Sequence, residues 1–252
     1  MLRPRFLFAA RLASLHLLAS LLVMVATGLL VFVLWYPAPY YKIAGGIELF
    51  LLIVGVDLVC GPLLTFVLGS PSKPRGELVR DIGLIVLIQL GALGYGVHSL
   101  YQARPVYLAW EGDRFRLVTA ADIEPVRLLV ASEAYRQLPV GGPQLVATRL
   151  LGATDPGYLI SIEDALKGLP PSYKPERWES YSKHMEQILA GARALQDLPE
   201  ASRNSPQLVG REAADPRTVY YPLEGSLDGN WIVLLTPDSA ELVDFLPLKG
   251  WR

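Results

Sequence analysis

The 252-residue sequence contains little cysteine and little histidine. Cys60 is the only cysteine, so no disulfide can form within the chain. The three histidines, His16, His98 and His184, are far apart in the sequence, and no CxxC, HExxH or HxH motif occurs. The sequence therefore predicts no zinc site. The GxGxxG, GxxxxGK[ST] and GxSxG motifs are also missing, so we expect no cofactor and no enzymatic activity.

Charged residues are also scarce. They make up 19% of the chain against 52% hydrophobic residues, whereas an average soluble domain has about 25% charged residues. The chain has 23 Lys and Arg against 24 Asp and Glu, a net charge of -1. Without a basic excess it cannot displace counterions from nucleic acid, so nucleic acid is excluded as a partner. The composition favours a membrane protein.

Three long apolar runs account for this composition, and they cover residues 13–35, 47–68 and 82–101. Each is about 20 residues or longer, the length at which an α-helix crosses a hydrocarbon layer of about 30 Å. We therefore predict a three-span transmembrane region over residues 1–101, in contact with the lipid bilayer. Residues 102–252 have an ordinary composition and are predicted to form a separate domain.

The basic residues in the short flanks predict the orientation, because Lys and Arg are retained on the cytoplasmic side. The loop at 36–46 has only Lys42, and the aromatic cluster Trp35, Tyr36, Tyr40 and Tyr41 lies at the same boundary. The other two flanks are richer in basic residues: Arg3, Arg5, Arg11, Lys73, Arg75 and Arg80. The prediction is a cytoplasmic N-terminus and a C-terminal domain on the far side of the membrane, which in a bacterial inner membrane is the periplasm.

The outer domain shows an α+β pattern. The segments 105–110 and 115–119 flank a short Gly-containing connection, and 231–236 and 241–246 flank a Pro- and Asp-containing turn, so two hairpins are expected. Ser161 and Asp164 resemble a capping box that opens a helix ending at Gly168. The spacing of apolar residues predicts a longer helix over 180–197. The Pro-rich composition of 198–217 predicts an exposed loop.

Asp57 is the most informative ionisable residue, because a carboxyl in the middle of a span is costly unless it is protonated or paired. Helical rise places Asp57 about 15 Å and Gln89 about 18 Å below the outer edge. Asp57, Gly61 and Thr65 recur every four residues on one face, and Gln89 begins a small and polar face on the third span with Ala92 and Gly96. Such faces let membrane helices approach and share hydrogen bonds.

Two interpretations of this intramembrane seam remain open. In one, Asp57 and Gln89 join two helices of the same chain; in the other, the seam receives a helix of another protein. Pro62 adds to the seam, because it leaves the carbonyl of Leu58 without its helical donor. A catalytic role is disfavoured, since an intramembrane aspartyl site needs two facing carboxylates and Asp81 lies about 16 Å deeper.

A second group of ionisable residues lies near the predicted outer surface. Glu48 and His98 are each within about one helical turn of that surface, and Arg104 follows just beyond. They could form an interfacial ion cluster, with anchoring at the interface as the simpler role.

Several segments together resemble the type IV pilin accessory proteins of the TfpX/TfpZ group. They are WYPAPY at 35–40, VGVD at 54–57, GPLLT at 61–65, SKPRGELVRD at 72–81 and ARPVYLAWEGDRFRLVTAADI at 103–123. The resemblance covers about residues 14–123, and the rest of the chain matches only in general form.

The resemblance implies a non-enzymatic inner-membrane protein that assists a type IV pilin before or during its incorporation into a pilus. The partner would be the pilin, through its apolar membrane helix and its periplasmic head. Asp57, Gly61, Pro62, Thr65 and Gln89 are our own candidates for the contact with the helix, chosen from polarity and spacing. The alternative is a membrane-anchored sensing or regulatory subunit whose periplasmic domain binds a small ligand.

Overall fold

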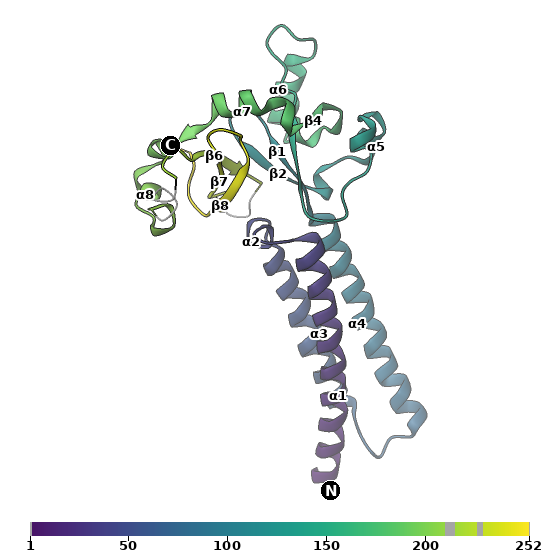
Figure 1. The fold of residues 1–252 in the computed structure, drawn as a ribbon. Coiled ribbons are helices and arrows are strands. Elements are labelled where there is room, and N and C mark those ends of the chain that lie inside the picture. The colour runs from purple at the N-terminus through teal and green to yellow at the C-terminus, as the bar shows by residue number, and fades with distance from the viewer. Residues whose placement is uncertain (1, 210–214, 226–228, 252) are drawn as a thin grey trace. The chain divides into compact units, whose positions relative to one another are not determined.

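The computed structural model describes residues 2–209, 215–225 and 229–251 (Figure 1). The chain divides into two compact units. Residues 2–35 and 46–102 form one, here called the helical unit, and residues 36–45 and 103–251 form the other, here called the sheet domain. The connection between the first two long helices therefore belongs to the sheet domain, although residues 46–102 separate it from the rest of that domain in the sequence.

The helical unit consists of three long helices. Helix α1 (Leu2–Leu29) continues as the π-helical segment η1 (Leu30–Trp35), α3 covers Gly46–Leu68 and α4 covers Arg75–Ala103. All three are long and apolar enough to cross a membrane. The three long apolar helices that the sequence predicts are therefore present, and α1 and α4 begin several residues before the apolar runs.

Helices α1 and α3 pack closely along their length, whereas α4 approaches them less closely and diverges toward its N-terminal end (Figure 1). Edge-to-face ring pairs hold α1 against α3 at both ends of the hairpin. Phe6 and Phe66 have ring centroids 5.4 Å apart, and Phe32 and Phe50 have ring centroids 5.1 Å apart. Between these pairs α3 presents a buried stripe at every fourth residue: Ile53, Asp57, Gly61 and Thr65.

The sheet domain is built on one mixed sheet with the strand order β4-β3-β1-β2-β6-β7-β8 and with β5 paired to β6. Strands β1 (Pro105–Trp110) and β2 (Phe115–Thr119) form the first expected hairpin, and β7 (Trp231–Leu235) and β8 (Leu242–Leu246) form the second. The other strands are β3 (Gln144–Thr148), β4 (Trp178–Ser180), β5 (Arg193–Ala194) and β6 (Val219–Glu224). Three long apolar helices followed by this domain confirm the membrane-anchored α+β class.

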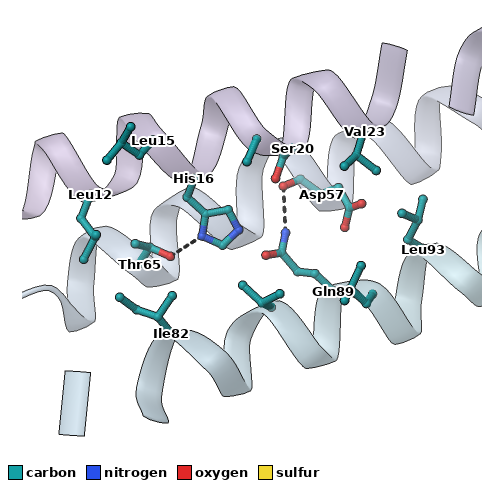
Figure 2. Close-up of a pocket in the computed structure, with 13 residues that line it drawn as sticks. Leu12, Leu15, His16, Ser20, Val23, Asp57, Thr65, Ile82, Gln89 and Leu93 are labelled. Atoms are coloured by element: carbon teal, nitrogen blue, oxygen red, sulfur yellow. Dashed lines mark hydrogen bonds between the residues drawn. The ribbon is translucent and has the colours of Figure 1, made fainter. Parts of the chain in front are cut away.

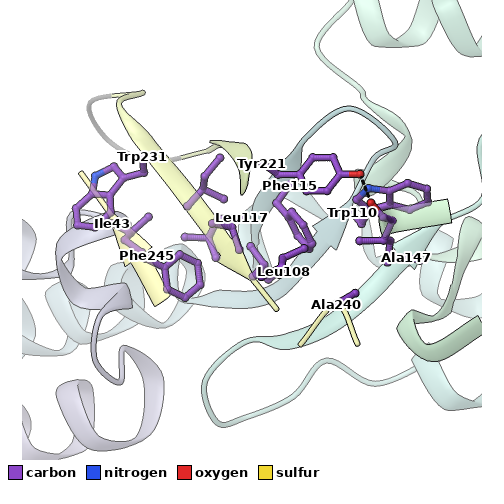
Figure 3. Packing of buried hydrophobic residues seen from close by; sticks show 14 residues of the cluster. Ile43, Leu108, Trp110, Phe115, Leu117, Ala147, Tyr221, Trp231, Ala240 and Phe245 are labelled. Atoms are coloured by element: carbon purple, nitrogen blue, oxygen red, sulfur yellow. Dashed lines mark hydrogen bonds between the residues drawn. The ribbon is translucent and has the colours of Figure 1, made fainter. Parts of the chain in front are cut away.

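Short helices surround the sheet. They are α2 (Tyr40–Ile43), α5 (Pro125–Val130), α6 (Tyr158–Leu166), α7 (Met185–Gly191) and α8 (Glu200–Arg203). Strand β1 is buried at every residue because both faces of the sheet are covered. On one face Leu108 packs in a cluster with Phe115 and Trp231 (Figure 3). On the other face Tyr107 packs near Trp178, with ring centroids 4.3 Å apart.

The loop between α1 and α3 contributes to this core. Ile43, at the end of α2, is fully buried in the cluster that contains Trp231 and Phe245 (Figure 3). Tyr40 packs edge-to-face on Phe245, with ring centroids 5.3 Å apart. The short segment between two membrane spans is therefore a structural part of the sheet domain.

Two sequence-based helix predictions were wrong in detail. The predicted helix over 180–197 is interrupted: residues 181–191 and 195–197 are helical, and between them Arg193 and Ala194 pair with β6. Gly191 ends α7 at a close approach to β6, where a Cβ would lie 2.8 Å from the Tyr221 hydroxyl. Helix α6 does end before Gly168, which has a φ of 85°, but it begins after Gly157. Ser161 therefore lies inside the helix and does not cap it.

The segment 198–217 is also more ordered than an exposed loop. It contains α8, and the side chains of Leu198 and Leu208 are buried against Tyr220 and Ile232 in a third apolar cluster. Part of that predicted loop, residues 210–214, lies outside the described residues.

Candidate functional site

The structure brings Asp57 and Gln89 together in the middle of the helical unit. Asp57 faces inward from α3 with 5% of its surface exposed. Nε2 of Gln89, on α4, donates a hydrogen bond of 3.0 Å to the backbone carbonyl oxygen of Asp57 (Figure 2). The two residues are therefore at the same depth, and this bond goes to the main chain of α3.

Gly61 makes this contact sterically possible. A Cβ built on Gly61 would lie 2.1 Å from Nε2 of Gln89, so any other residue would displace the amide. Gly96 on α4 has a similar role further along, where a Cβ would lie 2.7 Å from the side chain of Ile53. By contrast, a Cβ on Gly55 would meet nothing within 4 Å. The small residues on the seam are thus sites of close helix approach.

Thr65, the last residue of the predicted seam, is fully buried and bonds to α1. Its hydroxyl oxygen lies 2.6 Å from Nδ1 of His16 (Figure 2). Sequence analysis did not place His16 in the seam, because it was judged only as a metal ligand. The signal was available: His16 lies near the inner end of the first span and Thr65 near the inner end of the second, so their depths match as those of Asp57 and Gln89 do. Pro62 is half-buried, and α3 continues past it to Leu68.

A groove with a volume of about 260 Å³ lies beside these polar residues, between α1 and α4. We call it the α1–α4 groove. Its walls are mainly apolar, and its polar lining residues are His16, Ser20, Asp57, Thr65 and Gln89. A second groove of about 240 Å³ lies between α3 and α4, and Asp57 also borders that one. The lining of the α1–α4 groove includes Leu12, Leu15, Ser20, Val23, Val86 and Leu93.

Asp57 and Gln89 are not fully satisfied. Among the described residues, Oδ1 of Asp57 and Oε1 of Gln89 are buried and have no hydrogen-bond partner. The described part of the chain also contains no group of three residues that could hold a metal ion. A single carboxyl group beside an apolar groove is suited to binding a helix. An intramembrane aspartyl catalytic site would need a second carboxylate facing Asp57.

The three residues of the predicted interfacial cluster lie in two units. Glu48 and His98 belong to the helical unit, are exposed, and make no ion pair in the part of the chain that the structure describes. Arg104 belongs to the sheet domain, where it is 2% exposed and donates a 3.4 Å hydrogen bond to the carbonyl of Pro139. Burial raises the pKa of the neighbouring Tyr36, and the positive charge of Arg104 opposes that shift.

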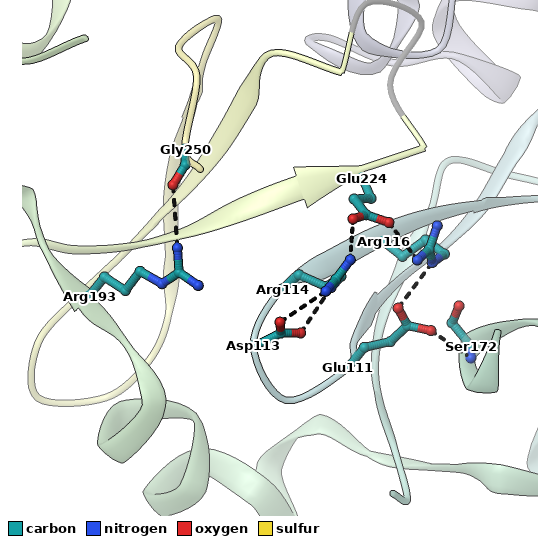
Figure 4. Close-up of polar contacts among 8 residues, drawn as sticks. All are labelled: Glu111, Asp113, Arg114, Arg116, Ser172, Arg193, Glu224 and Gly250. Carbon is teal, nitrogen blue, oxygen red and sulfur yellow. Dashed lines mark hydrogen bonds and ion pairs between the residues drawn. The ribbon is translucent and has the colours of Figure 1, made fainter. Parts of the chain in front are cut away.

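A cluster of charged residues joins the two halves of the sheet. Strands β2 and β6 pair in parallel at only two positions, and Arg116 at this junction bonds to Glu224 at 2.6 Å and to Glu111 at 3.0 Å (Figure 4). Arg114 also pairs with Glu224, and Glu111 accepts a hydrogen bond from the backbone N–H of Ser172 at 2.9 Å. We interpret this cluster as structural, because its charges are used to bond one strand to another.

Helix α6 exposes an apolar surface on the sheet domain. Leu159 is 77% exposed, Ile160 63% and Leu166 85%. The opposite side of the helix is attached to the domain, since Arg177 donates a 2.7 Å bond to Ser161 and Lys174 pairs with Asp164 at 2.6 Å. The helix therefore presents large apolar side chains to the surroundings from a fixed position.

Comparison with known proteins identifies relatives over nearly the whole chain. Residues 4–45 match the family model described as fimbrial assembly protein FimB. The "Fimbrial assembly protein, serogroup E1" of Dichelobacter nodosus is 36% identical over 239 residues, which cover 92% of this chain and 93% of the relative. The serogroup I protein of the same organism is 35% identical over 245 residues, with the same coverage.

A third relative from that organism, named for serogroups C1 and C2, is 47% identical over 121 residues, 48% of this chain and 92% of the relative. No solved structure matches the chain. The similarity to the first two relatives extends well beyond residues 14–123, where the resemblance was recognised in the sequence. The chain therefore belongs to the fimbrial assembly protein family, a family of type IV pilus accessory proteins.

Proposed function

We propose that this protein is a non-enzymatic accessory factor of type IV pilus assembly that binds a pilin before or during its incorporation into the pilus. Family membership supports the role in pilus assembly, because the relatives are named as fimbrial assembly proteins. The observation that carries pilin binding is the α1–α4 groove, where a buried carboxyl group with an unpaired oxygen borders an apolar channel between loosely packed helices.

The groove suits the apolar membrane helix of a pilin. Two helices pack closely in this unit and the third diverges, so α4 leaves apolar surface uncovered on both of its sides. Transmembrane helices associate through packing and shared hydrogen bonds, and both are available here. Binding would shield the pilin helix from premature association, which is the action of a chaperone.

The sheet domain would contact the pilin head, and α6 is the surface that we assign to this contact. Its exposed leucine and isoleucine side chains form an apolar surface of the kind that marks protein interfaces. We place the protein in the bacterial inner membrane with its N-terminus in the cytoplasm and its sheet domain in the periplasm, since basic residues flank the spans on one side. The α1–α4 groove and α6 would then contact the same pilin, and two weak contacts on one partner add avidity.

Co-purification tests this function. The full chain, tagged and co-expressed with the type IV pilin of the producing strain, is expected to retain that pilin in mild detergent, and deletion of its gene is expected to lower pilin level and surface pili. Asp57→Ala should reduce pilin recovery, whereas Leu63→Ala, which changes a 57% exposed residue of the same helix, should not. Undiminished pili in the deletion strain, together with no recovered pilin, would refute the proposal.

A further inference from the structure

The two unpaired oxygen atoms in the helical unit define the chemistry of the missing partner. Oδ1 of Asp57 and Oε1 of Gln89 are buried without a hydrogen-bond partner among the described residues. The orientation of the Gln89 amide is fixed, because its nitrogen donates to the carbonyl of Asp57, which can only accept. Oε1 of Gln89 therefore acts as an acceptor, and Oδ1 of Asp57 acts as one when the carboxyl group is ionised. Within lipid, where water cannot replace a partner, unpaired polar groups are strongly unfavourable.

Polar groups elsewhere in the helical unit do not bond to Oδ1 of Asp57. The hydroxyl group of Thr65 and Nδ1 of His16 are engaged with each other at 2.6 Å. Figure 2 shows the Asp57 carboxyl group and the His16 ring on opposite sides of the Gln89 amide, with Val23 and Leu93 on the carboxyl side. On that side the labelled neighbours of the carboxyl group are apolar, and no described residue bonds to its Oδ1 atom.

The size of the groove restricts what can enter. Its volume is about 260 Å³, and a cavity of roughly 150 Å³ is known to hold one benzene molecule. The groove thus has room for one or two side chains of a neighbouring helix, and the rest of that helix would lie along the apolar edges formed by α1 and α4.

We infer that the α1–α4 groove binds a transmembrane helix that carries a hydrogen-bond donor at the depth of Asp57, and that this donor bonds to the carboxyl oxygen. The inference rests on the proposed function, in which the helix is the apolar anchor of the pilin. The donor is an N–H or O–H group. It can be neutral, as in a hydroxyl or an amide, or charged, as in an amine. Neutral and charged donors respond differently to substitution of Asp57.

Two substitutions of Asp57 test the acceptor. Asp57→Leu keeps a similar size and removes the oxygen atoms, whereas Asp57→Asn keeps one acceptor oxygen and removes the charge. Recovery of the co-expressed pilin is expected to fall about tenfold with Asp57→Leu. With Asp57→Asn it should stay near wild type if the donor is neutral and fall as far as with Asp57→Leu if the donor is an amine. Full recovery with Asp57→Leu would overturn the inference.

The pilin side provides a test that does not depend on the folding of this chain. A photo-crosslinking amino acid at Leu90, which lines the groove and is 57% exposed, should identify the pilin residues opposite. Replacing the donor side chain nearest to the crosslink should lower recovery by wild-type protein about tenfold and cause no further loss with Asp57→Leu.

The outcomes separate this inference from the proposed function. If wild-type protein recovers no pilin, the proposed function fails. The inference about the donor alone fails in two cases, both with pilin recovered by the wild-type protein. In one, Asp57→Leu and replacement of the pilin donor lower pilin recovery independently of each other. In the other, the crosslinked pilin segment contains no donor.

Discussion

The amide group of Gln89 occupies the space that a side chain on Gly61 would fill. A Cβ on Gly61 would lie 2.1 Å from Nε2 of Gln89, the atom that donates to the carbonyl of Asp57. The hydrogen bond between α3 and α4 therefore depends on a missing methyl group, and this relationship connects the sequence pattern of the seam to its geometry.

We expect Gly61→Ala to weaken the packing of α4 on α3. The new methyl group must displace Gln89, and overpacking of this kind destabilises by about 1–3 kcal/mol. Thermal unfolding of the full chain in detergent measures the effect. Gly55→Ala is the matched control on the same helix, because its Cβ would meet nothing within 4 Å. Equal melting temperatures for the two variants would contradict the close approach of Gln89.

The bond between His16 and Thr65 is expected to couple α1 to α3. Hydrogen bonds between membrane helices contribute about 0.6 kcal/mol on average in double-mutant cycles. A cycle of His16→Ala and Thr65→Val, read from unfolding in detergent, should give a coupling energy of about that size. Thr27→Val serves as control, since the hydroxyl group of Thr27 bonds only to the carbonyl of Val23 in its own helix. A coupling energy of zero would show that the contact adds no stability.

Ile43→Ala should destabilise the sheet domain, although Ile43 lies between two membrane spans. The side chain is fully buried next to Trp231 and Phe245, and removing such a side chain costs about 2–5 kcal/mol. Fluorescence of the tryptophans during denaturation reports on this core. Lys42→Ala, at the exposed neighbouring position, should leave the transition unchanged. An Ile43→Ala variant with an unchanged denaturation transition would mean that this loop is not part of the core.

Acid should destabilise the sheet domain through two paired carboxylates. The hydrogen bond from Arg114 lowers the pKa of Asp113, and the hydrogen bond from Lys174 lowers the pKa of Asp164. Since both pKa values are lower in the folded chain, the unfolded chain binds more protons, and the stabilisation present above the ordinary carboxyl value of about 4 is lost as the pH falls below it. Melting temperatures between pH 3 and 7 measure this loss.

Asn variants of Asp113 and Asp164 provide the control for the acid experiment. Each should lower stability at pH 7 and reduce the dependence of the melting temperature on pH below about 4. An unchanged dependence in the double variant would assign the acid effect to other groups.

Substitution on α6 tests the proposed contact with the pilin head. Leu159→Ser with Leu166→Ser should lower pilin recovery without lowering the melting temperature, because both side chains are mostly exposed at 77% and 85%. Glu163→Ala, which removes only the exposed ion pair with Lys167, is the matched control on the same helix. Wild-type recovery by the double variant would move the head contact to another surface.

The sequence by itself determined the three spans, the α+β class and the two hairpins. Long uncharged runs allow only a membrane helix, and apolar strands around short turns pair locally, so neither depends on distant residues. Matching of depths also identified Asp57 and Gln89 as neighbours, since helical rise is constant.

The tertiary structure decided the remaining features, because they depend on contacts between segments far apart in the chain. Pairing of Arg193 and Ala194 with β6 ended a helix that local spacing had extended to residue 197. Burial of Ile43 against Trp231 and Phe245 placed the first loop in the sheet domain. Gln89 donates to the backbone carbonyl of Asp57, and Oδ1 of the Asp57 carboxyl group has no partner among the described residues. Periodicity gives the face and depth of a side chain, and only packing selects which of its atoms are bonded.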